Sequence, residues 1–259
     1  MDFVETTIEG SIGTICLDHL EKRNALSAAL IEQIAKALAS FTEARARVVV
    51  LRARPGVKIW SSGHDVDELP EGRRDPLGWY DPLRVLIRAI ENHPAPVIAM
   101  IEGGVFGGAC EAAMACDIVI AAPNATFALT PAKLGVPYNV SGMLTFLNSA
   151  SLRIIKEMAF TARPIAAERA LRIGLINHLT PLEELESFTY AMAADIVENA
   201  PLSIAVMKEE LRILAGAHPM SPQGFERVQG LRRIVYESSD YVEGIRAFKE
   251  KRKPVYRGQ

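Results

Sequence analysis

The chain contains 259 residues, of which 49% are hydrophobic and 23% charged, a globular composition that excludes a disordered chain, a collagen-like fibre and a coiled coil. Its 29 basic and 31 acidic residues give a formal net charge of -2, which argues against a protein that coats nucleic acid. The 3 cysteines form no CxxC motif and the 5 histidines no HExxH motif, which argues against a disulfide framework and a metal site.

The start of the chain carries no targeting signal. Residues 1–10 are acidic and contain no apolar run, so we expect no signal peptide. A membrane-spanning helix needs about 18 apolar residues in succession, and the sequence has no such stretch. We therefore expect a soluble, cytoplasmic protein without membrane or nucleic-acid partners.

In the first half of the chain, strand patterns alternate with helix patterns. Strands are predicted at residues 10–17, 47–52, 58–60, 97–101 and 117–122. Ser27 is a suitable cap for a helix with apolar residues at 30, 34, 38 and 41, and Asp81-Pro82 opens a second helix that runs to residue 91. This alternation predicts an α/β fold with a largely parallel sheet.

The second half is mainly helical. Helices are predicted at residues 151–160, 166–173, 182–198, 201–215, 222–236 and 240–251, with one strand signal at 175–179. Length alone allows one or two domains. We expect an α/β core over residues 1–200 and a helical C-terminal part, residues 201–259, that packs on the core or on neighbouring subunits.

Two glycine-containing turns carry the strongest chemical signal. Residues 60–69 pass through Gly63 after a short strand, and residues 101–111 pass through four glycines from a buried strand into a helix. Free amides at a helix start attract negative charge. The second turn has neither the lysine of a phosphate loop nor the G-x-G-x-x-G spacing, so an oxyanion hole suits it better. An ordinary polar turn and tight helix–sheet packing are the alternatives.

Together the two turns resemble those of the crotonase superfamily, also called the enoyl-CoA hydratase/isomerase family. The matching segments are residues 24–27, 62–65 with Glu68, 103–111 with Asp117, 127–135, 170–176 and 250–254. The resemblance covers essentially the whole chain. It implies a ββα spiral core, a helical C-terminal trimerisation part, and a homotrimer or homohexamer.

The resemblance also implies a site for an acyl-CoA thioester. The backbone amides of His64 and Gly108 would bind the carbonyl oxygen. Lys251 would approach the phosphates of coenzyme A, either from the same chain or from a neighbouring subunit. Six basic residues lie between 246 and 257, so this segment is either an anion site or a solvated helix end. The other residues implied in substrate binding are Arg23, Ala25, Leu26, Ser62, Gly63, Asp65, Val66, Asp67, Glu68 and Thr130. No metal and no cofactor beyond the coenzyme A of the substrate is implied.

One position departs from the family pattern and reduces the number of reactions that the sequence favours. Hydratases of the family carry two glutamates; Glu111 matches one, but Pro131 stands where the other belongs. Paired acid–base hydration therefore looks unfavourable. Residues 64–70, 74–84, 127–139, 226–236 and 248–254 resemble the branch of the family that decarboxylates methylmalonyl-CoA to propionyl-CoA and carbon dioxide.

In that branch Tyr138 would hold the departing carboxylate; otherwise it is a packed loop aromatic. The roles of Glu111 and of the His64 imidazole stay open. Glu111 is a relic, a supporting group or a proton route. The His64 imidazole either shapes the pocket or supplies a proton, and by default it is a surface-turn histidine.

The first alternative to decarboxylation is another acyl-CoA reaction (hydration, isomerisation or thioester hydrolysis), testable with crotonyl-CoA. A non-catalytic RNA-binding member is the second, testable by salt-dependent oligonucleotide binding.

Overall fold

Ten strands form two sheets in the part of the chain that the computed structural model describes, residues 2–70, 72 and 74–259. They are β1 (Val4–Glu9), β2 (Ile12–Leu17), β3 (Val48–Ala53), β4 (Ile59–Ser61), β5 (Val97–Ile101), β6 (Gly104–Phe106), β7 (Ile118–Ala121), β8 (Thr126–Ala128), β9 (Ile165–Ala166) and β10 (His178–Leu179). The predicted strand 97–101 has the bounds of β5, and the other predicted strands each contain or overlap an observed one.

The larger sheet has the strand order β1-β2-β3-β5-β7-β10. Its first pair is antiparallel and the remaining pairs are parallel, which confirms the largely parallel sheet predicted from the alternation of strands and helices. The smaller sheet, β4-β6-β8-β9, was not predicted. Its strands β4 and β6 pair in parallel, and this brings together the two glycine-containing turns that follow them.

Ten α-helices surround these sheets in the described ranges. They are α1 (Ala28–Glu43), α2 (Pro82–Glu91), α3 (Gly108–Ala115), α4 (Val140–Ser149), α5 (Leu152–Thr161), α6 (Ala167–Arg172), α7 (Leu185–Glu198), α8 (Pro201–Ala215), α9 (Pro222–Tyr236) and α10 (Ser239–Lys249). Four short 3-10 helices are η1 (Leu20–Lys22), η2 (Val66–Glu68), η3 (Pro131–Leu134) and η4 (Leu182–Glu184). The predicted caps form: the Ser27 hydroxyl accepts from the Leu30 amide, and the Asp81 carboxylate accepts from the Leu83 amide.

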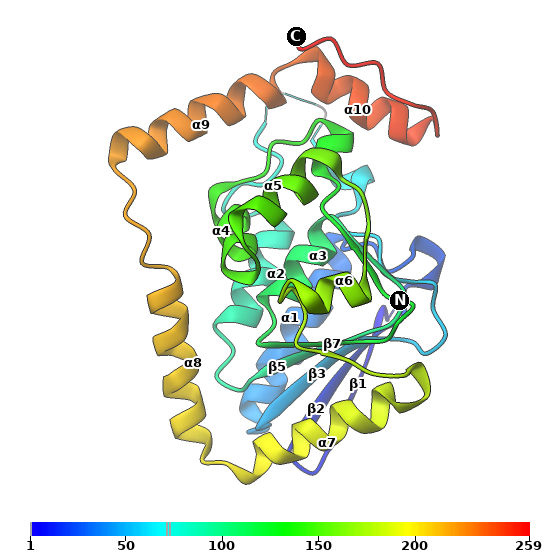
Figure 1. Cartoon of the computed structure of the whole chain (residues 1–259), viewed down its shortest axis with the longest axis vertical. Coiled ribbons are helices and arrows are strands. Elements are labelled where there is room, and N and C mark those ends of the chain that lie inside the picture. The colour runs from blue at the N-terminus through cyan, green and yellow to red at the C-terminus, as the bar shows by residue number, and fades with distance from the viewer. Residues whose placement is uncertain (1, 71, 73) are drawn as a thin grey trace.

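The larger sheet is covered on both faces (Figure 1). Successive side chains of a strand point to opposite faces, so a strand buried on both sides is apolar throughout. In β3, Val49 and Leu51 pack into the cluster formed with α1 and α2, whereas Val48 and Val50 pack against α7. The continuous apolar run of β3 is therefore explained by burial of both faces of this strand.

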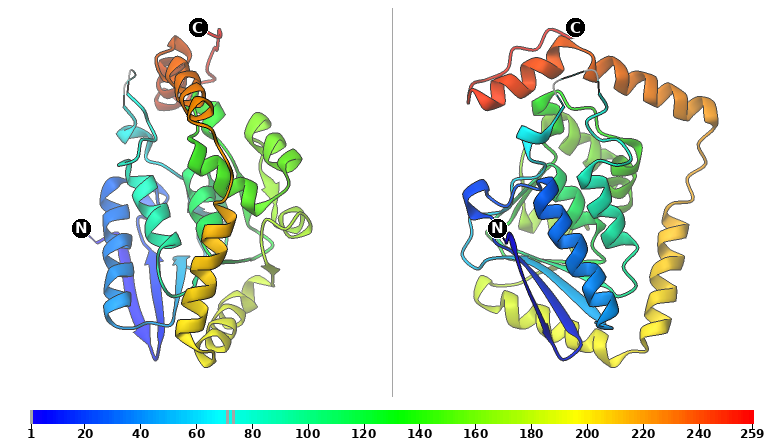
Figure 2. Two further views of the ribbon diagram at one scale, coloured as in Figure 1. Left: turned by 90° about the vertical axis from the view of Figure 1, so that its left-hand side faces the viewer. Right: turned by 180° about the vertical axis from the view of Figure 1, so that it is seen from behind.

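The last three helices extend away from this core and return to it (Figures 1 and 2). Helix α8 contains no buried residue and is tethered by Lys208, whose Nζ lies 2.7 Å from an Asp117 carboxylate oxygen. Helix α10 packs back on the core, where the buried Tyr241 hydroxyl donates to the Pro70 carbonyl at 2.9 Å. Within the described ranges, no helix is both long and apolar enough to cross a membrane.

Candidate active site

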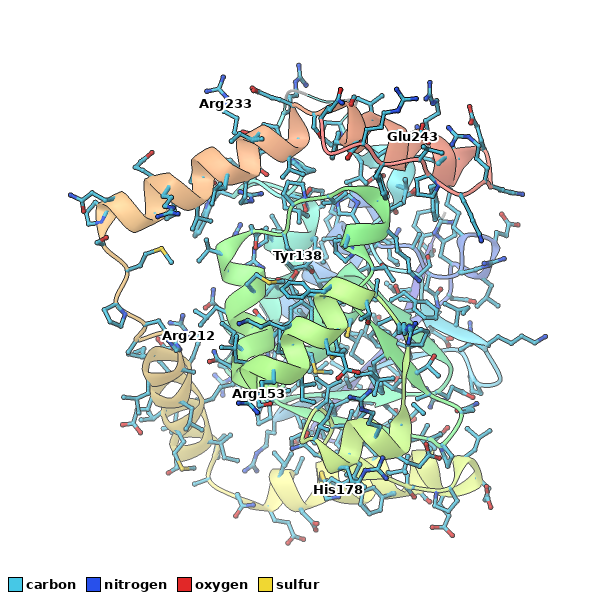
Figure 3. The ribbon with its side chains drawn as sticks, turned by 45° about the horizontal axis from the view of Figure 1, so that its top comes forward. Tyr138, Arg153, His178, Arg212, Arg233 and Glu243 are labelled. Atoms are coloured by element: carbon cyan, nitrogen blue, oxygen red, sulfur yellow. The ribbon has the colours of Figure 1, made fainter. Side chains whose placement is uncertain are left out.

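A cavity of about 830 Å³ lies where the two glycine turns, η3, α10 and the tail after α10 meet. Figure 3 shows Tyr138, in the loop before α4, and Glu243, on α10, on the elements that border this region. The predicted site residues that line the cavity are Arg23, Ala25, Ser62, His64, Asp65, Val66, Asp67, Gly108, Thr130, Tyr138 and Lys251. The topology thus gathers one cavity from segments that are more than 200 residues apart.

The remaining four predicted residues do not line the cavity: Leu26, Gly63 and Glu111 are buried, and Glu68 is exposed. The Leu26 amide donates to the Gly63 carbonyl at 2.8 Å, which ties the first loop to the turn after β4. A Glu68 carboxylate oxygen accepts from the Ala28 amide at 2.7 Å and so closes the start of α1. These contacts hold the cavity wall in place.

The two amides proposed for the oxyanion hole belong to adjacent turns. Gly63 has φ +89, and a Cβ built on it would lie 2.3 Å from the Phe106 carbonyl oxygen and 3.0 Å from the Gly108 nitrogen. A Cβ on Gly108 would lie 3.4 Å from the His64 nitrogen. Gly108 is the first residue of α3, so its amide has no acceptor within the helix. Among the described residues no hydrogen bond engages either amide, and both remain free for a ligand oxygen.

Behind the cavity wall lies a buried ionic network. Glu111 is 0% exposed; one carboxylate oxygen pairs with the Arg84 guanidinium and the other accepts from the Tyr138 hydroxyl at 2.5 Å. Burial raises the pKa of Glu111 to about 7, although Arg84 and Tyr138 act in the opposite direction. Burial and the neighbouring carboxylate raise the pKa of Tyr138 well above its usual value, so its hydroxyl keeps its proton.

The expectation that His64 has a surface side chain is wrong. The imidazole is 11% exposed, with Nε2 3.1 Å from an Asp81 carboxylate oxygen and Nδ1 3.0 Å from the Asp65 carbonyl oxygen. Since both partners only accept hydrogen bonds, both nitrogens are satisfied when the ring is protonated. Burial opposes this charge, but the hydrogen bond and charge of Asp81, the Asp65 carbonyl and the charge of Glu68 together outweigh it, and the pKa of His64 is raised.

The first turn of α2 supports three of these features at once. The carboxylate of Asp81 caps the helix and binds His64, and Leu83 packs against Gly108, where an added Cβ would lie 2.8 Å from its Cδ2. Arg84 follows directly and pairs with Glu111. The sequence predicted a helix start at Asp81-Pro82 and placed residues 81–84 in the branch resemblance, but it assigned these residues no role in the site. The structure adds that Arg84, a cation on an amphipathic helix, is only 5% exposed.

The charged residues that line the cavity are mainly basic. Lys22, Arg23, Lys133, Lys251 and Arg252 line it together with the acidic residues Glu21, Asp65 and Asp67. Lys22 is partly neutralised by Asp65, at 2.8 Å. The tail that carries Lys251 is fixed by Glu243, which binds Arg246, Arg252 and the Val255 amide; these bonds lower the pKa of the Glu243 carboxyl. Lys251 thus reaches the cavity of its own chain, and its role toward a phosphate-bearing ligand stays a prediction.

Two further observations concern metal sites and cysteines. Residues 2–70, 72 and 74–259 contain no group of three or more histidine, cysteine or carboxylate side chains that could hold a metal ion. Cys110 and Cys116 are buried, as expected for core residues, and burial raises the pKa of the Cys110 thiol to about 12.

This fold and oxyanion geometry define a protein class. A family model described as enoyl-CoA hydratase/isomerase matches residues 7–259, and the chain belongs to this family. It is 48% identical to methylmalonyl-CoA decarboxylase of Escherichia coli K12, over 99% of this chain and 98% of that protein. Carnitinyl-CoA dehydratase of Escherichia coli O157:H7 is 33% identical over 98% of the chain and 97% of that protein.

The solved structures agree. Methylmalonyl-CoA decarboxylase in complex with 2-nitronate-propionyl-CoA is 48% identical and superposes with a TM-score of 0.98, covering 100% of this chain and 99% of that one. The same name applies to a complex with 2S-carboxypropyl-CoA, also at a TM-score of 0.98. The resemblance and the crotonase fold predicted from the sequence are confirmed.

Proposed function

We propose that this chain is a carboxy-lyase that decarboxylates methylmalonyl-CoA to propionyl-CoA and carbon dioxide. The observation that carries the proposal is the pair of free amides, His64 and Gly108, which face a cavity whose wall has Pro131 where a hydratase needs its second glutamate. Full-length similarity to methylmalonyl-CoA decarboxylase, at 48% identity, supports it.

The chemistry follows from where the charge develops. When the C–C bond to the carboxylate breaks, its electron pair enters the thioester and places negative charge on the carbonyl oxygen. Two fixed amides, one of them at the start of α3, stabilise that enolate, and one such donor is worth about 3 kcal/mol. The thioester itself accepts the electrons, so no group beyond the coenzyme A of the substrate is required.

Orientation is the second requirement. The breaking bond must stand perpendicular to the thioester plane so that its electrons overlap with the carbonyl. Tyr138 lines the cavity and is the group we assign to hold the carboxylate in that position. Its hydroxyl donates to Glu111 in this structure and would have to turn from Glu111 to donate to the substrate carboxylate. Val136 and Leu134 line the same wall and restrict water around the carboxylate.

The direct test incubates the purified protein with methylmalonyl-CoA and follows propionyl-CoA by mass spectrometry. Turnover supports the proposal; no turnover, together with hydration of crotonyl-CoA, contradicts it. Tyr138→Phe should lower kcat about 10- to 100-fold with little change in KM, since a hydrogen bond to a charged group contributes about 1.5–3 kcal/mol. Tyr236→Phe, a tyrosine that does not line the cavity, is the matched control.

We also propose that the protein forms a homotrimer or homohexamer. The apolar side chains Leu202, Leu214 and Ile234, on α8 and α9, are 81%, 71% and 68% exposed. Apolar surface of this extent on two consecutive helices marks a protein interface. Leu214→Glu should lower the mass measured by light scattering, and an unchanged mass would remove α8 from the interface. A cytoplasmic location and the division at residue 200 stay predictions.

A further inference from the structure

The chain between η2 and α2 contributes part of the cavity wall. Leu69 and Leu77 both line the cavity, and both are buried. Next to Leu69, the Pro70 carbonyl accepts from the Tyr241 hydroxyl of α10 at 2.9 Å. The Leu77 carbonyl accepts from the Asn139 side-chain amide at 3.0 Å. This part of the wall is therefore held by elements that lie far away in the sequence.

A charge pair holds the same wall from α9. The Arg232 guanidinium binds both carboxylate oxygens of Asp75, and its Nη1 lies 2.8 Å from Oδ2. The Gln229 side-chain oxygen accepts from the same nitrogen at 2.9 Å. Asp75 in turn accepts from the Leu77 amide at 3.0 Å. The charge pair is thus joined directly to the backbone of a leucine that lines the cavity.

Arg232 is the residue by which α9 contacts this wall. Of the residues of α9, all of which the structure describes, Arg232 alone is buried, at 5% exposed, whereas the apolar Leu231 and Ile234 are exposed. A buried guanidinium is costly unless it is paired. Two parallel hydrogen bonds from arginine to a carboxylate also fix the orientation of both groups, which an apolar contact does not. The pair therefore sets the position of Asp75 precisely.

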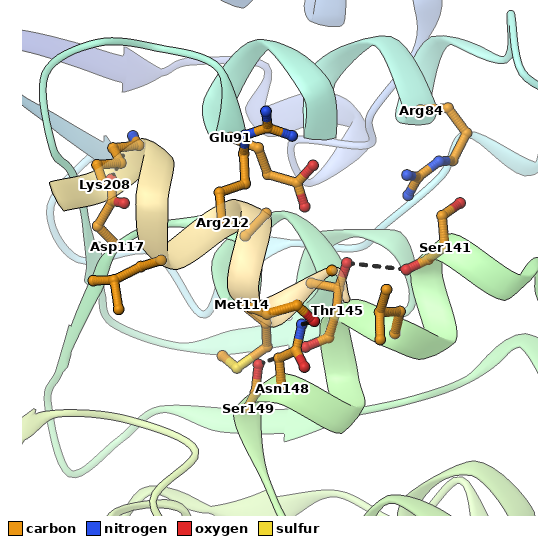
Figure 4. Close-up of a pocket in the computed structure, with 15 residues that line it drawn as sticks. Arg84, Glu91, Met114, Asp117, Ser141, Thr145, Asn148, Ser149, Lys208 and Arg212 are labelled. Carbon is orange, nitrogen blue, oxygen red and sulfur yellow. Dashed lines mark hydrogen bonds and ion pairs between the residues drawn. The ribbon is translucent and has the colours of Figure 1, made fainter. Parts of the chain in front are cut away.

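The contact from Asn139 is a weaker constraint on Leu77. Asn139 caps α4, and Ser141, two residues further, lines a second cavity of about 360 Å³ between α2, α4 and α8 (Figure 4). Close packing is what holds protein elements in place, so the first turn of α4 is less constrained on the side of this cavity. The position of Leu77 therefore depends on the pair of Asp75 and Arg232.

We propose that Arg232 is a positioning residue for the decarboxylation and acts through Asp75 on the cavity wall at Leu77. The proposal rests on the proposed function and deepens it. Leu77 is bonded to the residue that follows Tyr138, the group assigned to the substrate carboxylate. Since the breaking bond must stand perpendicular to the thioester plane, the wall beside the carboxylate must keep its place.

A loss of the pair should change kcat more than KM. A displacement of about 1 Å at a positioning wall costs up to about 100-fold in rate. Binding of coenzyme A is assigned to other residues, Arg23 and Lys251, which line the cavity themselves and do not act through Asp75. The affinity for the thioester should therefore be largely retained while the orientation of its carboxylate is lost.

The experiment removes the charge and measures both kinetic constants with methylmalonyl-CoA. Arg232→Met should lower kcat about 10- to 100-fold and change KM less than about threefold. Arg232→Lys, which can bind a single carboxylate oxygen, should recover part of the loss. Arg233→Met is the matched control, because Arg233 is an exposed arginine of the same helix that pairs with Glu237 (Figure 3). It should leave both constants unchanged.

Asp75→Asn tests the pair from its other side. The amide oxygen can still accept from the Leu77 amide, but the charge is gone, so kcat should fall as it does in Arg232→Met. Because the two residues act as a unit, the double variant should be no slower than the slower single variant. Circular dichroism and light scattering check that fold and assembly are kept. The Asp75 side chain is 31% exposed, so this variant decides the matter even if Arg232→Met fails to fold.

Three results would overturn the inference: an unchanged kcat in a folded variant of either residue, a rise in KM without a fall in kcat, or an equal loss in Arg233→Met. A double variant whose loss is the product of the two single losses would also contradict it. Release of carbon dioxide by the wild type is measured in the same series. Its absence would refute the proposed function itself, a result distinct from normal release that the variants leave unchanged.

Discussion

Gly63→Ala should damage both folding and catalysis, because a methyl group at this position has no room. Gly63 has φ +89, which costs an L-residue about 1–2 kcal/mol. The added carbon would also lie 2.3 Å from the Phe106 carbonyl oxygen, and overpacking of this kind typically costs about 1–3 kcal/mol. We expect the free energy of unfolding to fall by about 2–5 kcal/mol.

The folded fraction of this variant should also lose activity. Relief of the clash must move the Phe106–Gly108 backbone away from His64, and loss of one oxyanion donor lowers kcat about 100- to 1,000-fold. Gly174→Ala is the matched control, since Gly174 has φ +76 but no atom within 4 Å of its added Cβ. Urea unfolding and a decarboxylation assay measure the two effects. If Gly63→Ala matched Gly174→Ala in both, the reasoning from close backbone approach would be refuted.

Three further predictions concern charge. Arg84→Met should lower the free energy of unfolding by about 3–5 kcal/mol at neutral pH, because it leaves Glu111 buried without its cation; recovery in the double variant with Glu111→Gln, measured in urea, checks the cause. The pKa of Glu111 is about 7 when folded against an ordinary 4.5, so the folded state holds the extra proton between these values. Its contribution to stability is full below about pH 4.5 and lost as pH rises through about 7; the wild type should therefore lose stability relative to Glu111→Gln across that window, and a constant difference would contradict this. Lys251→Ala should raise KM for the CoA thioester several-fold with little change in kcat, and the effect should shrink in high salt, whereas Lys36→Ala on α1 should leave KM unchanged.

Much of the fold could be predicted because local signals were strong. The apolar run of β5 is bounded by Pro96 and Glu102, and α8 and α9 begin at prolines that suit a first helical position. By contrast, α4 was missed because Gly142 and several hydroxyl side chains weaken its helical pattern. In the smaller sheet only β4 was predicted as a strand; β6, β8 and β9 have two to three residues each, which is too short for a period to show.

In the candidate site, too, some features have a local sequence signal and others arise only from packing. Backbone amides at glycine turns could be predicted, because glycine spacing is visible in the sequence and a family resemblance assigns the turns. The partners of Tyr138 and Glu111 could not, since Arg84 lies 27 residues before Glu111 and only the packing of α2 on α3 joins them. A buried ion pair leaves no periodic trace in the sequence.

The first turn of α2 also limits how this enzyme can be re-engineered. Asp81, Leu83 and Arg84 each serve a different part of the site, yet a single turn of backbone sets the position of all three. A change in its tilt or register would move the partners of the His64 imidazole, of Gly108 and of the Glu111 carboxylate together. Designers who seek a new reaction on this scaffold must therefore exchange the turn as one unit.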